Sequence, residues 1–225
     1  MKEKFSVRVL AEIAIFAAIG FALDALQGGI FKGIWYNGGS IGIAMIPIFI
    51  IAYRRGLLAG LLCGLVVSVV QMLGGIYALP AASFDNAFMK VMGPFIQVSL
   101  DYILAYFVVG FAGAFAGLYK NSESFKLKAL WIAVGVIVGG LLKYFCHVGA
   151  GYFWLDPEGK PFWGIENGTM IYSFIYNFFA VINVFICLPI MILIAKVYPK
   201  FLNPDYVDMD KEAESSSDEV ASNEN

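Results

Sequence analysis

The segment Ala129-Leu-Trp-Ile-Ala-Val-Gly-Val-Ile-Val-Gly-Gly-Leu-Leu142 contains no charged residue and decides the fold class of this chain. It runs on without a turn signal into Lys143-Tyr-Phe-Cys-His147, so the stretch predicts one long membrane helix. Of the 225 residues, 60% are hydrophobic and 14% are charged. Soluble domains are about 45–50% apolar and about 25% charged. We therefore predict an all-α integral membrane protein.

Long apolar runs predict six transmembrane helices, the second of which is short for a span. Lys and Arg residues gather in alternate connectors, ten on one side and three on the other. Because positive residues are retained on the cytoplasmic side, both termini are predicted to be cytoplasmic. The six runs are residues 6–27, 40–53, 56–76, 99–119, 128–153 and 169–195.

The end of the chain has a different composition. From Pro204 onward it holds eight of the seventeen acidic residues and one of the fifteen basic ones. Such a segment cannot bury enough apolar surface to fold. We therefore expect a membrane domain over residues 1–200 and a disordered, acidic cytoplasmic tail over residues 201–225.

Polar residues interrupt the apolar pattern at one place in the fifth predicted helix. Lys143, His147 and Gly151 are four residues apart and so share one helix face. Ionisable groups within a membrane usually face a cavity and mark a substrate or ion route. The alternative is a lysine that snorkels to the interface beside a histidine bonded to a neighbouring carbonyl.

Two other segments place polar groups at a similar depth. The sixth predicted helix carries a stripe of hydroxyl and amide side chains, and the fourth opens with Asp101-Tyr102. Taken singly, these residues also fit a helix-start acid, an aromatic belt and a helix-to-helix hydrogen bond. Together they predict a pocket for a small, flat, partly cationic molecule. The stripe consists of Tyr172, Ser173, Tyr176 and Asn177.

Several motifs resemble the thiamine-specific S-component, the substrate-binding subunit, of energy-coupling factor (ECF) vitamin transporters. The similarity spans about residues 5–200. The motifs are Lys143-Tyr-Phe-Cys-His147 with Ala150-Gly151 and Trp154, Tyr172-Ser173-xxx-Asn177, Leu100-Asp101-Tyr102, Ile46-Pro47-Ile48 with Arg54-Arg55-Gly56, and Val9-Leu-Ala-Glu-Ile-Ala.

The resemblance implies a six-helix subunit of the bacterial cell membrane that binds thiamine in an external pocket. Its implied partners are a transmembrane coupling subunit and two ATPase subunits, with no cofactor, metal or nucleic acid. Asp101 is expected to face the cationic vitamin, Trp35 to act as a lid, and Ala14 and Ala18 to dock on the coupling subunit. The remaining expected pocket residues are Tyr77, Gln97, Tyr102, Lys143, His147, Gly151, Trp154, Tyr172, Ser173 and Asn177.

The chain departs from the family pattern at two places. Some relatives carry a second acid in the second helix, where this chain has Gly42. The external connector over residues 78–98 is also longer than the family pattern.

Other function classes find less support in the sequence. There is no Gly-xxxx-Gly-Lys-Ser/Thr loop for ATP hydrolysis, and no His-Glu-xx-His zinc motif. Cys146 and His147 are adjacent, so they point to different helix faces and do not form a nucleophile–base pair. The open alternatives are an S-component for riboflavin or a thiamine precursor, an intramembrane enzyme, and a self-sufficient secondary transporter.

Overall fold

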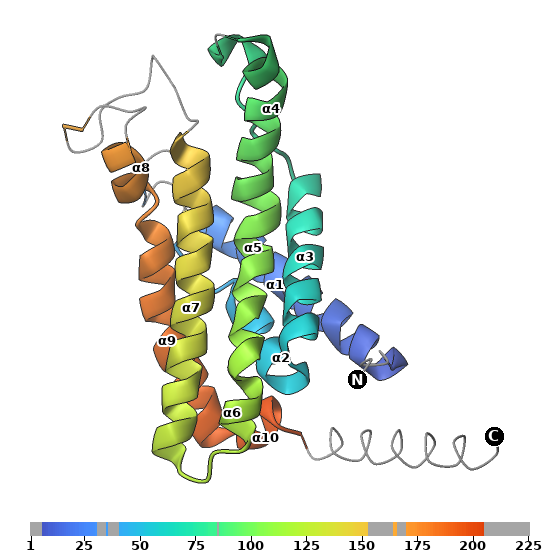
Figure 1. Ribbon diagram of the computed structural model, residues 1–225. Coiled ribbons are helices and arrows are strands. Elements are labelled where there is room, and N and C mark those ends of the chain that lie inside the picture. Colours follow the sequence, from blue (N-terminus) through green and yellow to red (C-terminus); the bar gives the residue numbers. More distant parts are fainter. Residues whose placement is uncertain are drawn as a thin grey trace, which may run out of the picture.

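The computed structural model describes residues 6–30, 35, 41–84, 86–152, 164–165 and 170–204. Within these ranges the chain is helical and contains no strand. Figure 1 shows long helices standing side by side, with α1 crossing them obliquely. The all-α prediction is therefore confirmed for the described residues.

The helices follow the predicted apolar runs in order. A single helical run from Ala87 to Lys120 combines five segments, in which a π-helical stretch (η3) and a 3-10 stretch (η4) interrupt the α-helix. The elements are α1 (Val7–Ile30), α2 (Ile46–Arg55), α3 (Leu57–Leu73), η2 (Ala81–Ser83), α4 (Ala87–Val98), η3 (Ser99–Leu104), α5 (Ala105–Phe107), η4 (Val108–Phe115), α6 (Ala116–Lys120), α7 (Phe125–Tyr152), α8 (Met170–Tyr176), α9 (Phe179–Val197) and α10 (Pro199–Leu202).

Four helical runs of the described residues are long and apolar enough to cross a membrane: Val7–Ile30, Ala87–Lys120, Phe125–Gly151 and Met170–Val197. The six predicted spans are therefore not all confirmed. The α2 helix has 10 residues, or about 15 Å, and α3 has 17 residues, or about 25 Å. Both are shorter than a hydrocarbon core of about 30 Å.

The predicted start of the fourth span, within the connector over residues 78–98, is corrected by the structure. The helix begins at Ala87, not at residue 99, and its N-cap Asn86 accepts a hydrogen bond from the Met89 backbone. Asp101 therefore lies inside a continuous helical run and not at a helix start. It belongs to η3, and π-helical turns inside α-helices are frequent at functional sites.

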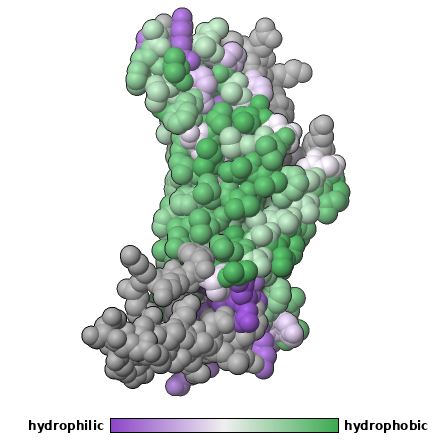
Figure 2. All heavy atoms as spheres, turned by 90° about the vertical axis from the view of Figure 1, so that its right-hand side faces the viewer, coloured by the Kyte–Doolittle hydropathy of each residue, from purple (hydrophilic) through white to green (hydrophobic). Residues whose placement is uncertain are grey.

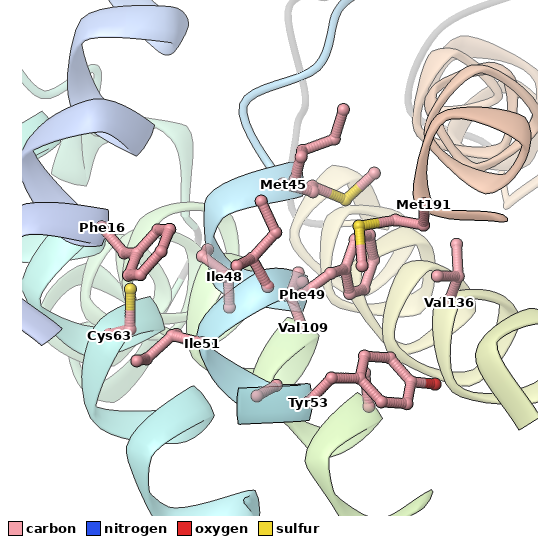
Figure 3. Close-up of a cluster of buried hydrophobic side chains, with 14 of the residues drawn as sticks. Phe16, Met45, Ile48, Phe49, Ile51, Tyr53, Cys63, Val109, Val136 and Met191 are labelled. Carbon is pink, nitrogen blue, oxygen red and sulfur yellow. The ribbon is translucent and has the colours of Figure 1, made fainter. Parts of the chain in front are cut away.

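The short α2 helix forms the centre of the bundle. Ile48, Phe49, Ile51 and Tyr53 have no exposed surface. Figure 3 shows their side chains meeting residues from α1, α3, η4, α7 and α9. A helix that is buried by protein on all sides has the same apolar sequence pattern as a helix that faces lipid. For this reason α2 was predicted as a span.

Several glycines permit close helix approach, as is typical of small residues in membrane helices. A Cβ on Gly60 would lie 2.8 Å from the backbone oxygen of Gly110. One on Gly113 would lie 2.7 Å from that of Gly56, and one on Gly139 would lie 2.7 Å from that of Val109. A Cβ on Gly117 would meet nothing within 4 Å, so no close approach among the described residues requires a glycine there.

Charged residues gather at the end of the bundle that contains α10. Glu12 of α1 forms ion pairs of 3.2 Å with Arg54 and 3.0 Å with Arg55. Arg54 also donates to the backbone oxygen of Phe201. The start of α1 and the end of the described chain thus lie on one side, shown at the lower end of Figure 1. The folded part reaches Leu202, which is fully buried, and the acidic residues from Asp205 on lie outside the described residues.

The surface of the bundle is divided into zones. In Figure 2 hydrophobic residues form a broad middle zone and hydrophilic residues lie at the two ends. This distribution is that of a protein whose middle contacts lipid hydrocarbon and whose ends contact water. The chain is a multi-pass membrane protein.

Candidate ligand-binding site

Asp101 and His147 form a close pair between the long central run and α7. The Asp101 Oδ1 and His147 Nδ1 atoms lie 3.0 Å apart, and the side chains are 22% and 14% exposed. The other carboxylate oxygen of Asp101 accepts a hydrogen bond of 2.9 Å from Gln97 Nε2. A partly buried carboxylate with both oxygens engaged is a fixed negative charge that a cationic ligand can face.

The segment before α4 is tied to this pair. The fully buried Gln97 accepts from the Leu79 backbone at 3.2 Å and donates to the Tyr77 carbonyl at 3.3 Å. The Tyr77 backbone N–H also donates to the Tyr102 hydroxyl at 2.9 Å. The side chain of Tyr77 is exposed. Tyr77 is thus next to the predicted site through its backbone.

The α8 helix packs its polar stripe against the end of α7. Ser173 donates to the Val148 carbonyl at 2.7 Å, and Asn177 donates to the His147 carbonyl at 3.1 Å. A Cβ on Gly151 would collide with Ser173 and come within 3.0 Å of Asn177 Nδ2. Gly151 therefore serves the close approach of α8 to α7. The predicted sixth helix is interrupted, because Asn177 and Phe178 separate α8 from α9.

The Phe179 ring packs against the His147 imidazole, and further aromatic rings pack around Phe179. The ring centroids of His147 and Phe179 lie 5.5 Å apart, and Trp35 meets Phe179 edge-on at 6.3 Å. Trp35 also donates to the Tyr176 carbonyl at 2.6 Å. Tyr172 and Tyr176 stack at 5.8 Å with an interplanar angle of 5°. Such faces suit the stacking of a planar ring and the attraction of a cation.

A second polar cluster lies one helical turn, or about 6 Å along α7, from His147. Lys143 is 4% exposed, and its Nζ lies 3.3 Å from the ring centroid of Tyr106. The Tyr106 hydroxyl donates to Asp24 of α1. Asp24 also accepts from Gln71 of α3 at 2.9 Å and from Gln27 at 3.1 Å. Residues of four helical elements thus gather around one carboxylate. We call this group of residues the Asp24 cluster (Asp24, Gln27, Gln71, Tyr106 and Lys143).

Because Gly42 has no Cβ, the Gln27 side chain of this cluster fits beside it. A Cβ on Gly42 would collide with the side chain of Gln27, which is itself buried. Gln27 Oε1 accepts from the Ala44 backbone at 3.2 Å, and the Gly42 backbone donates to Asn183 at 2.8 Å. The segment before α2 is therefore fixed to α1 and α9 by amide side chains.

The structure brings together most of the residues predicted for the pocket. These residues lie toward the end of the bundle that holds α4 and α8, which is the upper end of Figure 1. They are Asp101, Tyr102, His147, Gly151, Trp35, Tyr77, Tyr172, Ser173 and Asn177. Lys143 lies one turn deeper. Ala14 and Ala18 lie elsewhere, on an exposed face of α1. Trp154 falls outside the described residues.

Sequence reasoning found Lys143 but missed the other members of the Asp24 cluster, and it missed Phe179. The signal for the cluster was present, since Asp24 and Gln27 lie three residues apart in an otherwise apolar stretch of α1. In a membrane helix such residues face the protein interior. Phe179 carried no signal, because nothing local separates it from the many other phenylalanines. Among the described residues, no group of three His, Cys, Asp or Glu side chains could hold a metal ion.

The fold and these buried polar groups define a class: a helical, multi-pass membrane protein with a polar candidate site, flanked by aromatic rings, inside the bundle. Residues 10–203 match the sequence profile of the thiamine transporter protein family. The chain belongs to this family.

Individual relatives agree with the family match. The chain is 34% identical over 203 residues to the thiamine transporter ThiT of Bacillus subtilis (strain 168), covering 87% of this chain and 94% of the relative. It is 29% identical over 188 residues to ThiT of Lacticaseibacillus paracasei, covering 79% and 81%. A solved structure of ThiT from Listeria monocytogenes superimposes with a TM-score of 0.70 at 27% identity, covering 88% of this chain and 98% of that one.

Proposed function

We propose that this chain is the thiamine-binding S-component of an energy-coupling factor transporter. In this proposal it takes up thiamine with a separate transmembrane coupling subunit and two ATPase subunits, and it needs no cofactor of its own. The observation that carries the proposal is the Asp101–His147 pair with aromatic rings beside it, in a chain whose relatives are named thiamine transporters.

The chemistry of the site fits that of thiamine. The vitamin joins a permanently cationic thiazolium ring to a neutral aminopyrimidine. Asp101 supplies the negative charge for the cation, and Phe179, Tyr176 and Trp35 supply ring faces. Ser173 and Asn177 supply hydroxyl and amide groups near the same place.

The exposed face of α1 supports the proposed partnership. Ala14 and Ala18 are exposed and lie one turn apart, and Ala11 and Ala22 continue the same row of small exposed residues. In lipid, small residues allow two helices to approach closely, so this face suits docking on another membrane protein. It lies nearer to the Glu12–Arg54 end of the bundle than to the ligand site.

Two experiments test the proposal. Mass spectrometry of small molecules that co-purify with the detergent-solubilised chain should find thiamine, and finding another vitamin would overturn the substrate assignment. Uptake of labelled thiamine by cells that lack their own system should require co-expression of the coupling and ATPase subunits. ATP-independent uptake by this chain alone would contradict the shared-motor assignment.

A further inference from the structure

One end of the bundle carries an excess of positive charge. Among the described residues, the end that contains α10 holds eight basic residues and two acidic ones, a formal net charge of +6. The acidic residues are Glu12, which pairs with two of the arginines, and Glu123. The basic residues, which together we call the basic end, are Arg8, Arg54, Arg55, Lys120, Lys126, Lys128, Lys196 and Lys200.

Helix ends bring these charges together. The last turns of α2, α6, α9 and α10 each hold basic side chains, and α7 has two lysines in its first turn. Lys120 Nζ of α6 donates to the Arg54 carbonyl of α2 at 2.8 Å, and the Arg54 guanidinium donates to Phe201 of α10. Figure 2 shows hydrophilic residues at this lower end, below the hydrophobic middle zone. The members with exposed side chains are Arg8, Lys126, Lys196 and Lys200.

The described part of the chain ends at the same place. Leu202 is fully buried, Pro204 is buried, and the Asn203 backbone N–H donates to the Pro199 carbonyl at 3.1 Å. These contacts, with the bond from Arg54 to a carbonyl of α10, fix residue 204 at the basic end. Every residue after Pro204 is therefore tethered to one point at this end of the bundle.

The segment that follows has the opposite charge. Residues 205–225 hold eight acidic residues and one basic residue, a formal net charge of −7, which nearly cancels the +6 of the basic end and its two acids. Asp208 and Asp210 are four and six residues from Pro204, so they lie within about 14 and 21 Å of it even in a fully extended chain. Lys200 also lies within about 14 Å of Pro204, because four residues separate them. The first carboxylates of the segment can therefore reach the basic end.

We propose that the acidic segment of residues 205–225 binds in cis to the basic end of the same molecule. A single exposed ion pair contributes little, so the interaction depends on many charges acting together. The tether gives the segment an effective concentration on the order of millimolar at its binding surface. The inference does not depend on the proposed function, because it uses neither the ligand site nor a partner subunit.

Anionic phospholipid headgroups are the competing ligand for the basic end. Clusters of lysine and arginine at a membrane surface attract such headgroups, and this end is predicted to face the cytoplasmic leaflet. The headgroups must be recruited from the bilayer, whereas the acidic segment begins directly after the buried Pro204. The bound segment therefore shields the basic end from anionic lipid.

The direct test is zero-length cross-linking of carboxylates to amines with a carbodiimide. The purified full chain is placed in nanodiscs of phosphatidylcholine, and the linked peptides are identified by mass spectrometry. We expect links from residues 205–219 to Lys126, Lys196 or Lys200, with a yield that falls at least about threefold between about 20 mM and about 500 mM salt. Lys90 is the internal control, since it is exposed on α4 at the opposite end of the bundle and should form no such link. Absence of the expected links, or equal links to Lys90, overturns the proposal.

A charge-neutral segment of the same length gives a second readout. In this variant the eight acidic residues after Pro204 are replaced by their amides, and the acetylation rate of each lysine is measured in the folded protein. Acetylation of Lys196 and Lys200 should rise about threefold or more when the carboxylates are removed, and that of Lys90 should not change. Unchanged rates at Lys196 and Lys200 contradict binding in cis.

Nanodiscs in which about one third of the lipid is phosphatidylglycerol separate the two ligands of the basic end. If the acidic segment is the occupant, its links to Lys196 and Lys200 persist in these discs at the same salt concentration. If the links form in neutral discs but are lost in anionic ones, lipid headgroups occupy the basic end in a membrane and the proposal is overturned.

Discussion

Replacing Asp101 with asparagine isolates the charge of the candidate site. The amide has the same shape and its oxygen can still accept from Gln97, so the contact of 2.9 Å is retained. A carboxylate about 4 Å from a fixed cation contributes about 4 kcal/mol at an effective dielectric constant near 20. The Asp101 side chain is 22% exposed, and solvent screening lowers this to about 2–4 kcal/mol. We expect thiamine affinity to fall about 30- to 700-fold.

The assay is isothermal titration of the purified protein in detergent with thiamine and with an analogue that carries an uncharged aromatic ring in place of the thiazolium. The neutral analogue should bind the unmodified chain and the Asp101→Asn variant within about threefold of each other, a difference of under 1 kcal/mol. Equal losses for both ligands would show that Asp101 holds the structure through Gln97 and His147, and the electrostatic reasoning would be refuted.

Three further predictions concern other parts of the chain. Ala14→Trp should leave thiamine binding by the isolated subunit intact but abolish uptake and co-purification with the coupling subunit, because close helix approach is lost; normal assembly would reduce this face to ordinary lipid contact. Thiamine should quench tryptophan fluorescence, and Trp154→Ala should remove part of the quench and cost about 1–3 kcal/mol of binding; an unchanged signal and affinity would place Trp154 outside the site. Gly113→Leu should lower the melting temperature in detergent, at a cost of about 1–3 kcal/mol, because its Cβ would lie 2.7 Å from the Gly56 backbone. Gly117→Leu, where a Cβ meets nothing within 4 Å, is its control, and equal losses in both variants would exclude backbone contact as the cause.

The fold could be predicted from the sequence where the chain is long and apolar, and less well elsewhere. The runs at 6–27 and 128–153 became α1 and α7 almost as predicted, because a helix of lipid-spanning length needs no partner to satisfy its backbone. The run at 40–53 became the ten-residue α2, whose apolar side chains face other helices. The helix over Ala87–Val98 was missed because Gly93 and Pro94 have low helix propensity and the charge of Lys90 is unfavourable in a membrane span.

The sequence by itself determined what is local. Helical periodicity places Lys143, His147 and Gly151 on one face of α7 whatever the rest of the chain does. It also places Ser173 and Asn177 one turn apart, and the order of such motifs carried the family resemblance.

Only the tertiary structure decided which faces meet. Asp101 and His147 are 46 residues apart, Gln71 and Asp24 are 47 apart, and Tyr106 and Asp24 are 82 apart. Their contacts depend on the rotation and depth of each helix, which the packing of glycines and core side chains sets. Burying a polar group without a hydrogen-bond partner inside a membrane protein costs free energy. Helix arrangements in which these groups contact each other are therefore favoured. These contacts join segments that are distant in the sequence, so the local spacing of residues does not predict them.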